Sequence, residues 1–165
     1  MKGCDYMAIT TAEKLANYIK AKYYHKYKRE ISPLKLQKSL YFCFAYWGGF
    51  VRRGKNSEQM TEIDVSEFEE YLFDDAIEAW VYGPVVRSVY SKQNEIKKDL
   101  TSPFNNDFIT QFIDGILDDI LSISDFALVE ESHKDNCWKN NFDFNEMIHS
   151  NEIPKEDIIK EYVYK

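Results

Sequence analysis

The sequence predicts a mainly α, compact single-domain bundle of five to six helices, with a small β-hairpin around the Gly-Pro-Val turn at residues 83–85. Apolar residues recur at helical spacing over several separate stretches of the chain. Residues that favour helix N-caps stand at the start of these stretches. A chain of 165 residues with 44% hydrophobic content can bury one core of its own. We therefore expect a single domain over residues 1–165, with an N-terminal extension at 1–9.

Two helices are predicted in the first third of the chain. The first begins at Thr10-x-x-Glu13, a capping-box pattern that apolar residues follow at helical spacing. The second begins at Ser32-Pro33, because serine suits the N-cap and proline suits the first helical position. This second helix is apolar over most of its girth, so we expect it to lie at the centre of the core.

The second helix is expected to end at Gly48-Gly49, because glycine favours the left-handed backbone found at helix C-termini. Residues 50–66 are then expected to form a loop, and residues 52–71 are interpreted as an acidic insert or loop within the domain. A short helix from Ser66 to Leu72, with Ser66 as its cap, is also predicted.

Residues 79–90, AWVYGPVVRSVY, predict a short strand followed by a change of direction. Trp80 and Tyr82 suit a half-buried strand, and Gly83-Pro84 is typical of a turn. The valines behind the turn predict the start of another helix. We expect Gly83-Pro84 to turn the chain so that Trp80 and Tyr82 pack against the second helix.

The second half of the chain predicts three further helices. Residues 108–123 carry a stripe of isoleucine and phenylalanine at helical spacing. Ser124 is expected to cap the next helix, and Pro154 to open the last one. Residues 136–151 are predicted to be irregular or partly helical.

Composition and cysteine usage indicate a cytoplasmic protein. The sequence has no run of about 18 apolar residues, the length needed for a transmembrane helix. Its first residues lack the apolar block of a signal peptide. The three cysteines lie far apart, which argues against both a disulfide framework and a CxxC metal site.

Charge is distributed unevenly, although the net charge is −7. Residues 1–55 hold 12 Lys and Arg against 3 Asp and Glu, whereas residues 56–165 hold 9 against 25. This asymmetry could steer a charged partner to one face. The alternative, which we favour, is that the two halves neutralise each other or are solvated. The candidates for an acidic face lie in a run of acids without Lys or Arg, and are Glu62, Asp64, Glu67, Glu69, Glu70, Asp74 and Asp75.

The sequence carries no catalytic pattern, and we expect a protein that is not an enzyme and has no metal or cofactor. The histidines lack the spacing of zinc sites, and no GxSxG elbow is present. His133 and Cys137 could share a helix face; we favour a structural role for them over a nucleophilic or metal-binding one. Lysines interleaved with tyrosines at residues 20–38 could hold phosphates, but the pI of about 5.0 argues against a nucleic-acid partner.

Three motifs stand in order along the chain: SPLKLQKSLYF at 32–42, EAWVYGPVVRSVY at 78–90, and Leu128 with HKDNCW at 133–138. They resemble the LKLQKLLYF, EAWxYGPVxxxVY and L…THxxxPW elements of the Panacea domain family, the SocA-like or phage-associated GepA-like antitoxins. Cys137 and Ser132 stand where the family has proline and threonine. The resemblance extends over residues 10–165.

The resemblance implies an antitoxin that neutralises a cognate toxin by direct protein–protein binding. Members of the family are encoded beside toxins in bacteria, prophages and phages, and one resembles an adaptor that delivers its toxin to the ClpXP protease. The partners implied are therefore a toxin and, for an adaptor, ClpXP. The alternative is a phage or mobile-element protein that uses its acidic face to inhibit a host factor such as a defence protein.

The resemblance also gives the candidates for partner binding within the family motifs. Aromatic residues are frequent at protein interfaces but are also frequent in cores, and for Trp47, Trp80, Tyr41 and Phe44 we favour the core. For the polar Gln37 and Lys38 we favour buried pairing with the Tyr82-Gly83 turn over contact with a toxin. The candidates are Lys35, Gln37, Lys38, Tyr41, Trp80, Tyr82, Gly83, Pro84, Val85, Tyr90, His133 and Trp138.

Overall fold

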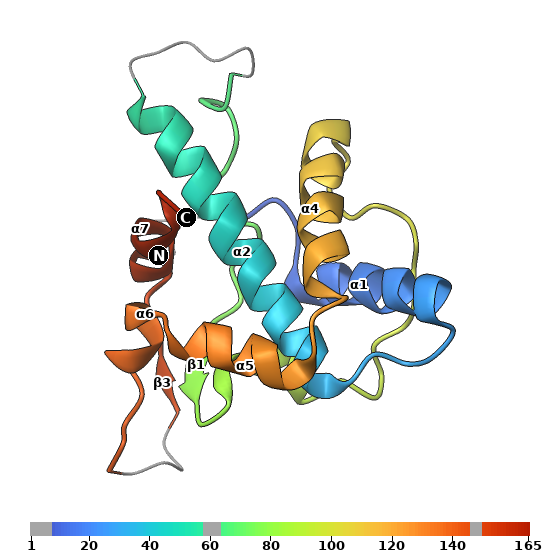
Figure 1. Cartoon of the computed structure of the whole chain (residues 1–165). Helices are drawn as coiled ribbons and strands as arrows, with labels where there is room; N and C mark the ends of the chain where they lie inside the picture. Colours follow the sequence, from blue (N-terminus) through green and yellow to red (C-terminus); the bar gives the residue numbers. More distant parts are fainter. Residues whose placement is uncertain (1–7, 58–63, 146–149) are drawn as a thin grey trace, which may run out of the picture.

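The computed structural model describes residues 8–57, 64–145 and 150–165. Within these ranges the chain forms seven helices and one three-stranded antiparallel sheet, which confirms the mainly α fold with a small hairpin (Figure 1). The helices are α1 (Ala12–Tyr27), α2 (Pro33–Asn56), α3 (Arg87–Tyr90), α4 (Asp107–Ile120), α5 (Asp125–His133), α6 (Asn136–Lys139) and α7 (Lys155–Tyr162). The strands are β1 (Ile77–Trp80), β2 (Gly83–Val86) and β3 (Asn151–Glu152).

Helix α2 is the centre of the fold, as expected from its apolar girth. It packs against α1, α4, α5, α7 and β2, and Figure 1 shows it running through the middle of the molecule. Its aromatic residues Tyr41, Phe44 and Trp47 are fully buried, so the core interpretation of these three residues is confirmed. Ser32 caps α2 by accepting a hydrogen bond from the backbone N–H of Lys35, and Pro33 occupies the first turn as predicted.

The prediction that α2 ends at Gly48-Gly49 is wrong, because the helix continues to Asn56. The two glycines instead leave room for α7 to pack closely against α2. A β-carbon on Gly48 would lie 2.7 Å from Cγ1 of Ile159, and one on Gly49 would lie 2.6 Å from the carbonyl carbon of Tyr162. The loop predicted at residues 50–66 therefore begins later, and the first five residues of the proposed acidic insert at 52–71 are helical.

Substitution of Gly49 tests this close contact between α2 and α7. We expect Gly49→Ala to lower the free energy of unfolding by about 1–3 kcal/mol, because the new methyl group would overlap the α7 backbone. Gly115→Ala in α4 is the matched control, since a β-carbon at that position would meet nothing within 4 Å; it is expected to stabilise by about 0.5–1 kcal/mol through helix propensity. Urea unfolding measures both changes, and equal effects would contradict the packing role.

Two local predictions in the N-terminal half of the chain are also wrong. Thr11, rather than Thr10, caps α1 and accepts a hydrogen bond from the Lys14 N–H. Residues 66–72 form turns without a helix. At the end of this stretch the carbonyl groups of Tyr71 and Leu72 accept hydrogen bonds from the backbone N–H groups of Ile9 and Thr10, so it pairs with the segment before α1.

The hairpin is confirmed, but its turn lies two residues earlier than predicted. Val81 and Tyr82 form the turn, and Gly83 and Pro84 are the first residues of β2. Gly83 has φ +104°, a backbone region that side chains disfavour. Pro84 is tolerated in β2 because this strand lies at the edge of the sheet, whose order is β2-β1-β3. The third strand was not predicted.

The helices of the second half agree with the sequence. Helix α4 covers most of the predicted stretch at 108–123, and Asn106 caps it. Ser124 caps α5 through the Ala127 N–H, and Pro154 precedes α7. Within the stretch predicted as irregular or partly helical, residues 136–139 form α6. Among the helices described, none has both the length and the hydropathy that a membrane span requires.

Candidate binding site

The β1–β2 hairpin is held to α2 by two buried polar side chains. Gln37 forms a pair of hydrogen bonds with Val86: its amide nitrogen donates to the Val86 carbonyl at 3.3 Å, and its amide oxygen accepts from the Val86 N–H at 2.8 Å. The Nζ atom of Lys38 donates to the Pro84 carbonyl at 2.9 Å. Both polar residues of α2 are thus buried and paired, as expected. Their partners are Val86 and Pro84 of strand β2, whereas the sequence had suggested the Tyr82-Gly83 turn.

Lys38 is fully buried, and burial lowers its pKa to about 7. An ammonium group without water loses solvation that a single carbonyl cannot replace. The neutral amine is consequently favoured in the folded protein at pH values above about 7. Lys38 is thus a structural lysine whose position under the hairpin leaves it inaccessible to a partner.

Two residues of the late motif, His133 and Trp138, also contact the backbone of this hairpin near its turn. The Nε2 atom of His133 lies 3.0 Å from the Val81 carbonyl, and Trp138 Nε1 donates to the Trp80 carbonyl at 2.8 Å. The two rings stack with centroids 4.2 Å apart. Burial lowers the pKa of His133, so the neutral ring donates its Nε2 proton to the carbonyl. These two residues position the hairpin.

A buried carboxylate ties α2 to α6 and α7. Asp135 is 1% exposed and accepts hydrogen bonds from the hydroxyl groups of Tyr41 and Tyr162 and from Nζ of Lys165. Burial raises the pKa of both tyrosines, so both remain donors. Tyr41, a candidate for partner binding, therefore acts inside the fold.

Cys137 lies beside this cluster, with its sulfur 3.3 Å from the Tyr41 hydroxyl oxygen. Burial raises the pKa of the Cys137 thiol to about 12. Reactive cysteines have lowered pKa values and some exposure, so this thiol has the opposite character. In the part of the chain that the structure describes, no group of three or more His, Cys, Asp or Glu side chains is placed to hold a metal ion.

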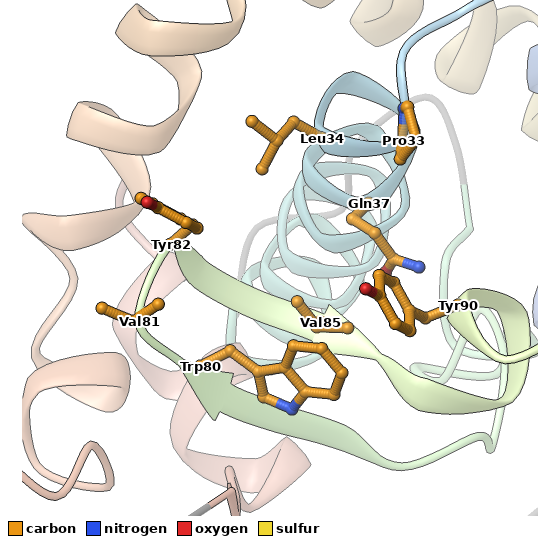
Figure 2. Close-up of a pocket in the computed structure, with 8 residues that line it drawn as sticks. All are labelled: Pro33, Leu34, Gln37, Trp80, Val81, Tyr82, Val85 and Tyr90. Carbon is orange, nitrogen blue, oxygen red and sulfur yellow. The ribbon is translucent and has the colours of Figure 1, made fainter. Parts of the chain in front are cut away.

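An apolar groove lies between the hairpin and the first turn of α2 (Figure 2). Its volume is about 270 Å³. Five of the predicted candidates line it, which are Gln37, Trp80, Tyr82, Val85 and Tyr90. Tyr82 is 61% exposed and Tyr90 43% exposed, so the expectation that Tyr82 packs against α2 is wrong. Large exposed apolar side chains around a hollow are typical of protein interaction sites.

Three further residues of the groove were missed in the sequence, namely Pro33, Leu34 and Val81. Leu34 and Val81 are 36% and 41% exposed. Pro33 and Leu34 occupy the first turn of α2, where the chain enters the core from the surface, so an apolar residue there need not be buried. An apolar pair directly behind an N-cap serine is the signal that could have found them.

The remaining candidates do not line the groove and have structural roles in the fold. Lys35 is mostly buried, donates to the Leu121 carbonyl at 3.1 Å and lies 3.7 Å from a carboxylate oxygen of Asp125. Gly83 leaves room for Lys38 and Ser132, since a β-carbon there would lie 2.9 Å from Cε of Lys38. Together with Pro84, Tyr41, His133 and Trp138, these residues hold the hairpin and α2 in place.

The acidic candidates do not form one free face. Glu70 pairs with Arg52, and Asp75 accepts hydrogen bonds from the Ala12 N–H at 3.1 Å and from the Ser88 hydroxyl at 2.6 Å. Asp64 accepts from the Ser66 N–H at its exposed position. The exposed members are Asp64, Glu67, Glu69 and Asp74. Glu62 lies outside the described residues.

Ion pairs join the basic and acidic parts of the chain. Lys22 lies 3.2 Å from Asp114, and Arg52 lies 2.8 Å from Glu156. Each pair joins a cation from residues 1–55 to an acid from residues 56–165. The charge asymmetry in the sequence is thus partly neutralised within the fold, which is the alternative that the sequence favoured.

Comparison with known proteins gives one family. The model of the family described as "Antitoxin SocA-like, Panacea domain" matches residues 60–154, more than half of the chain. The match contains the β1–β2 hairpin, α3, and the His133 and Trp138 pair that holds the turn. It does not contain α2, which supplies the other wall of the groove. No curated protein and no solved structure matches the chain.

Proposed function

Because the chain belongs to the antitoxin SocA-like, Panacea domain family, we propose that it neutralises a cognate toxin by binding it directly. The groove supports this proposal. Within the region matched by the family model, the hairpin turns apolar side chains toward solvent, whereas polar side chains from α2 and the late motif fix its backbone. A rigid hairpin with exposed aromatic residues is suited to protein–protein contact, because little conformational entropy is lost on binding.

The proposal is tested by co-expression with the product of the neighbouring gene. The tagged protein is purified from its native host, and co-purifying proteins are identified by mass spectrometry. We expect the neighbouring gene product to be recovered, to arrest growth when expressed alone, and to lose this effect when both proteins are present. Toxicity that persists in the presence of the soluble, folded partner would contradict the proposal.

Delivery of the toxin to ClpXP is a finer form of the same proposal. The same growth assay in cells with and without ClpXP separates the two forms. Direct neutralisation predicts rescue in both strains, since binding alone blocks the toxin. An adaptor predicts rescue only where the protease is present, together with a toxin lifetime that falls when the antitoxin is expressed.

Tyr82 offers a variant that tests the groove without disturbing the fold. Tyr82 is 61% exposed at the turn, and we expect Tyr82→Ala to weaken toxin binding by about ten-fold or more, as loss of an aromatic interface anchor does. The thermal midpoint of unfolding is expected to stay close to that of the wild type. Tyr164→Ala is the control, because Tyr164 is 88% exposed and lies outside the groove. Equal affinity of both variants and the wild type would exclude Tyr82 from the interface.

A further inference from the structure

A second hollow shares Pro33 with the apolar groove. It has a volume of about 440 Å³, and its lining is mostly polar. The first turn of α2 borders both hollows through Pro33, and the segment that follows α3 borders the second one through Gln93 and Asn94. Tyr90 of the groove and Gln93 of the second hollow are three residues apart. The two hollows are therefore neighbours on one surface of the molecule.

The second hollow has an excess of positive charge. Lys20, Lys98 and Glu30 are its ionisable residues. The Nζ atom of Lys20 donates to the Ile96 carbonyl at 3.1 Å, which fixes the ammonium group at the wall, and no carboxylate of the described residues forms an ion pair with it. Lys98 does pair with Glu30, but the two side chains are 38% and 56% exposed. Exposed ion pairs contribute little and exchange readily, so Lys98 can turn to another acid.

Gln93, which lines this hollow, carries an acceptor without a partner. The amide oxygen of Gln93 is buried and finds no donor within the described residues. Buried polar atoms without a partner are infrequent in folded proteins. Rotation of the Gln93 side chain toward the hollow would let this oxygen accept from a bound segment, while the lysines would take a carboxylate.

We propose that the groove and the second hollow form one docking surface for a toxin segment that carries an aromatic or aliphatic side chain close to an acidic one. The apolar side chain lies in the groove beside Leu34 and Tyr90, and the carboxylate lies between Lys20 and Lys98. The proposal rests on the proposed antitoxin function, which it deepens by stating the chemistry of the partner. Charge complementarity supports it, because the hollow holds two lysines against one acid, and Lys20 has no ion-pair partner among the described residues.

The test uses two substitutions. Each has a control variant that makes the same change at an exposed residue of the same type outside the docking surface. Leu34→Asp introduces a charge into the groove, and Leu100→Asp places the same change at another exposed leucine. Lys98→Glu reverses a charge of the second hollow, and Lys97→Glu does so at the exposed residue next to it, outside the lining. An aspartate in the first turn of α2 suits the helix dipole, so Leu34→Asp is expected to fold, and circular dichroism checks all four variants.

A displayed library of random peptides is selected on the full-length protein, and the enriched peptides are synthesised for affinity measurements. We expect peptides with an aromatic or aliphatic residue close to Asp or Glu, bound less tightly as salt rises. Leu34→Asp and Lys98→Glu should each weaken binding about ten-fold or more, and the two control variants should leave it unchanged. Enrichment without acidic residues, or equal affinities for all four variants, would overturn the docking surface.

The outcomes separate this inference from the proposed function. If the toxin is neutralised and bound alike by the wild type, Leu34→Asp and Lys98→Glu, the docking surface is wrong and the antitoxin function stands. If the peptides bind as expected while no toxin is neutralised, the surface stands and the antitoxin function is wrong.

Discussion

Replacement of Asp135 by alanine is expected to lower the free energy of unfolding by about 2–6 kcal/mol, because two buried hydroxyl groups would each lose their acceptor. The carboxylate is 1% exposed and is the shared acceptor of Tyr41, Tyr162 and Lys165. Alanine would leave two hydroxyl groups in the interior without this acceptor. Because domains are stable by only about 5–15 kcal/mol, this single change is expected to bring the protein close to unfolding.

Two further variants show whether the loss of stability comes from this hydrogen-bond network or would follow the loss of any acidic residue. Tyr162→Phe removes one donor and leaves the others, and we expect a smaller loss of about 1.5–3 kcal/mol. Asp74→Ala removes an exposed acid and is expected to change stability by less than about 0.5 kcal/mol. Urea unfolding followed by circular dichroism gives all three values. An Asp135→Ala protein as stable as the Asp74→Ala control would show that the network does not stabilise the fold.

The second large effect concerns Lys38 and pH. Folding lowers the pKa of Lys38 from 10.5 to about 7 by burial, so between these values the unfolded chain holds a proton that the folded protein has released. Stability therefore rises with pH across this window, by up to about 1.4 kcal/mol for each pH unit. Below pH 7 both states carry the proton, and the contribution of Lys38 no longer changes with pH.

Lys38→Met isolates this contribution, since methionine keeps much of the apolar stem and cannot titrate. The difference in stability between the wild type and Lys38→Met should shift in favour of the wild type as pH rises from 7 to about 9.5. His133 is the titratable neighbour from α5, and its pKa is lowered, so it changes charge below this window. Lys97→Met, at an exposed site, should show no such shift. A constant difference for Lys38→Met across the window would mean that Lys38 stays charged in the folded protein.

Local capping signals account for what the sequence predicted well. Ser32 and Ser124 start helices because each side-chain oxygen accepts a hydrogen bond from the backbone N–H three residues ahead. The end of α2 could not be predicted in the same way. Gly48-Gly49 looks like a helix terminus, but its glycines are needed where α7 crosses, more than 100 residues later in the chain. Strand β3 has only two residues, and its pairing with β1 defines it.

The candidate site also combines features that local sequence predicts with features that depend on distant parts of the chain. The hairpin that forms one side of the groove was predicted, because aromatic and β-branched residues around Gly83-Pro84 indicate a strand and a turn locally, but the groove itself was not. That Gln37 and Lys38 need partners was also predictable from their place in an apolar helix. Their actual partners, Val86 and Pro84, follow from how β2 lies across α2. The sequence favoured the buried position of Tyr41 that is observed, but it could not show that Tyr82 would point outward.

The most direct test of the account is a titration of the purified cognate toxin with the purified protein, with no protease present. We predict saturable binding and a loss of toxin activity that follows the fraction of toxin bound, both weakened by Tyr82→Ala and unchanged by Tyr164→Ala. Full toxin activity at a saturating concentration of the wild-type protein would contradict neutralisation by direct binding.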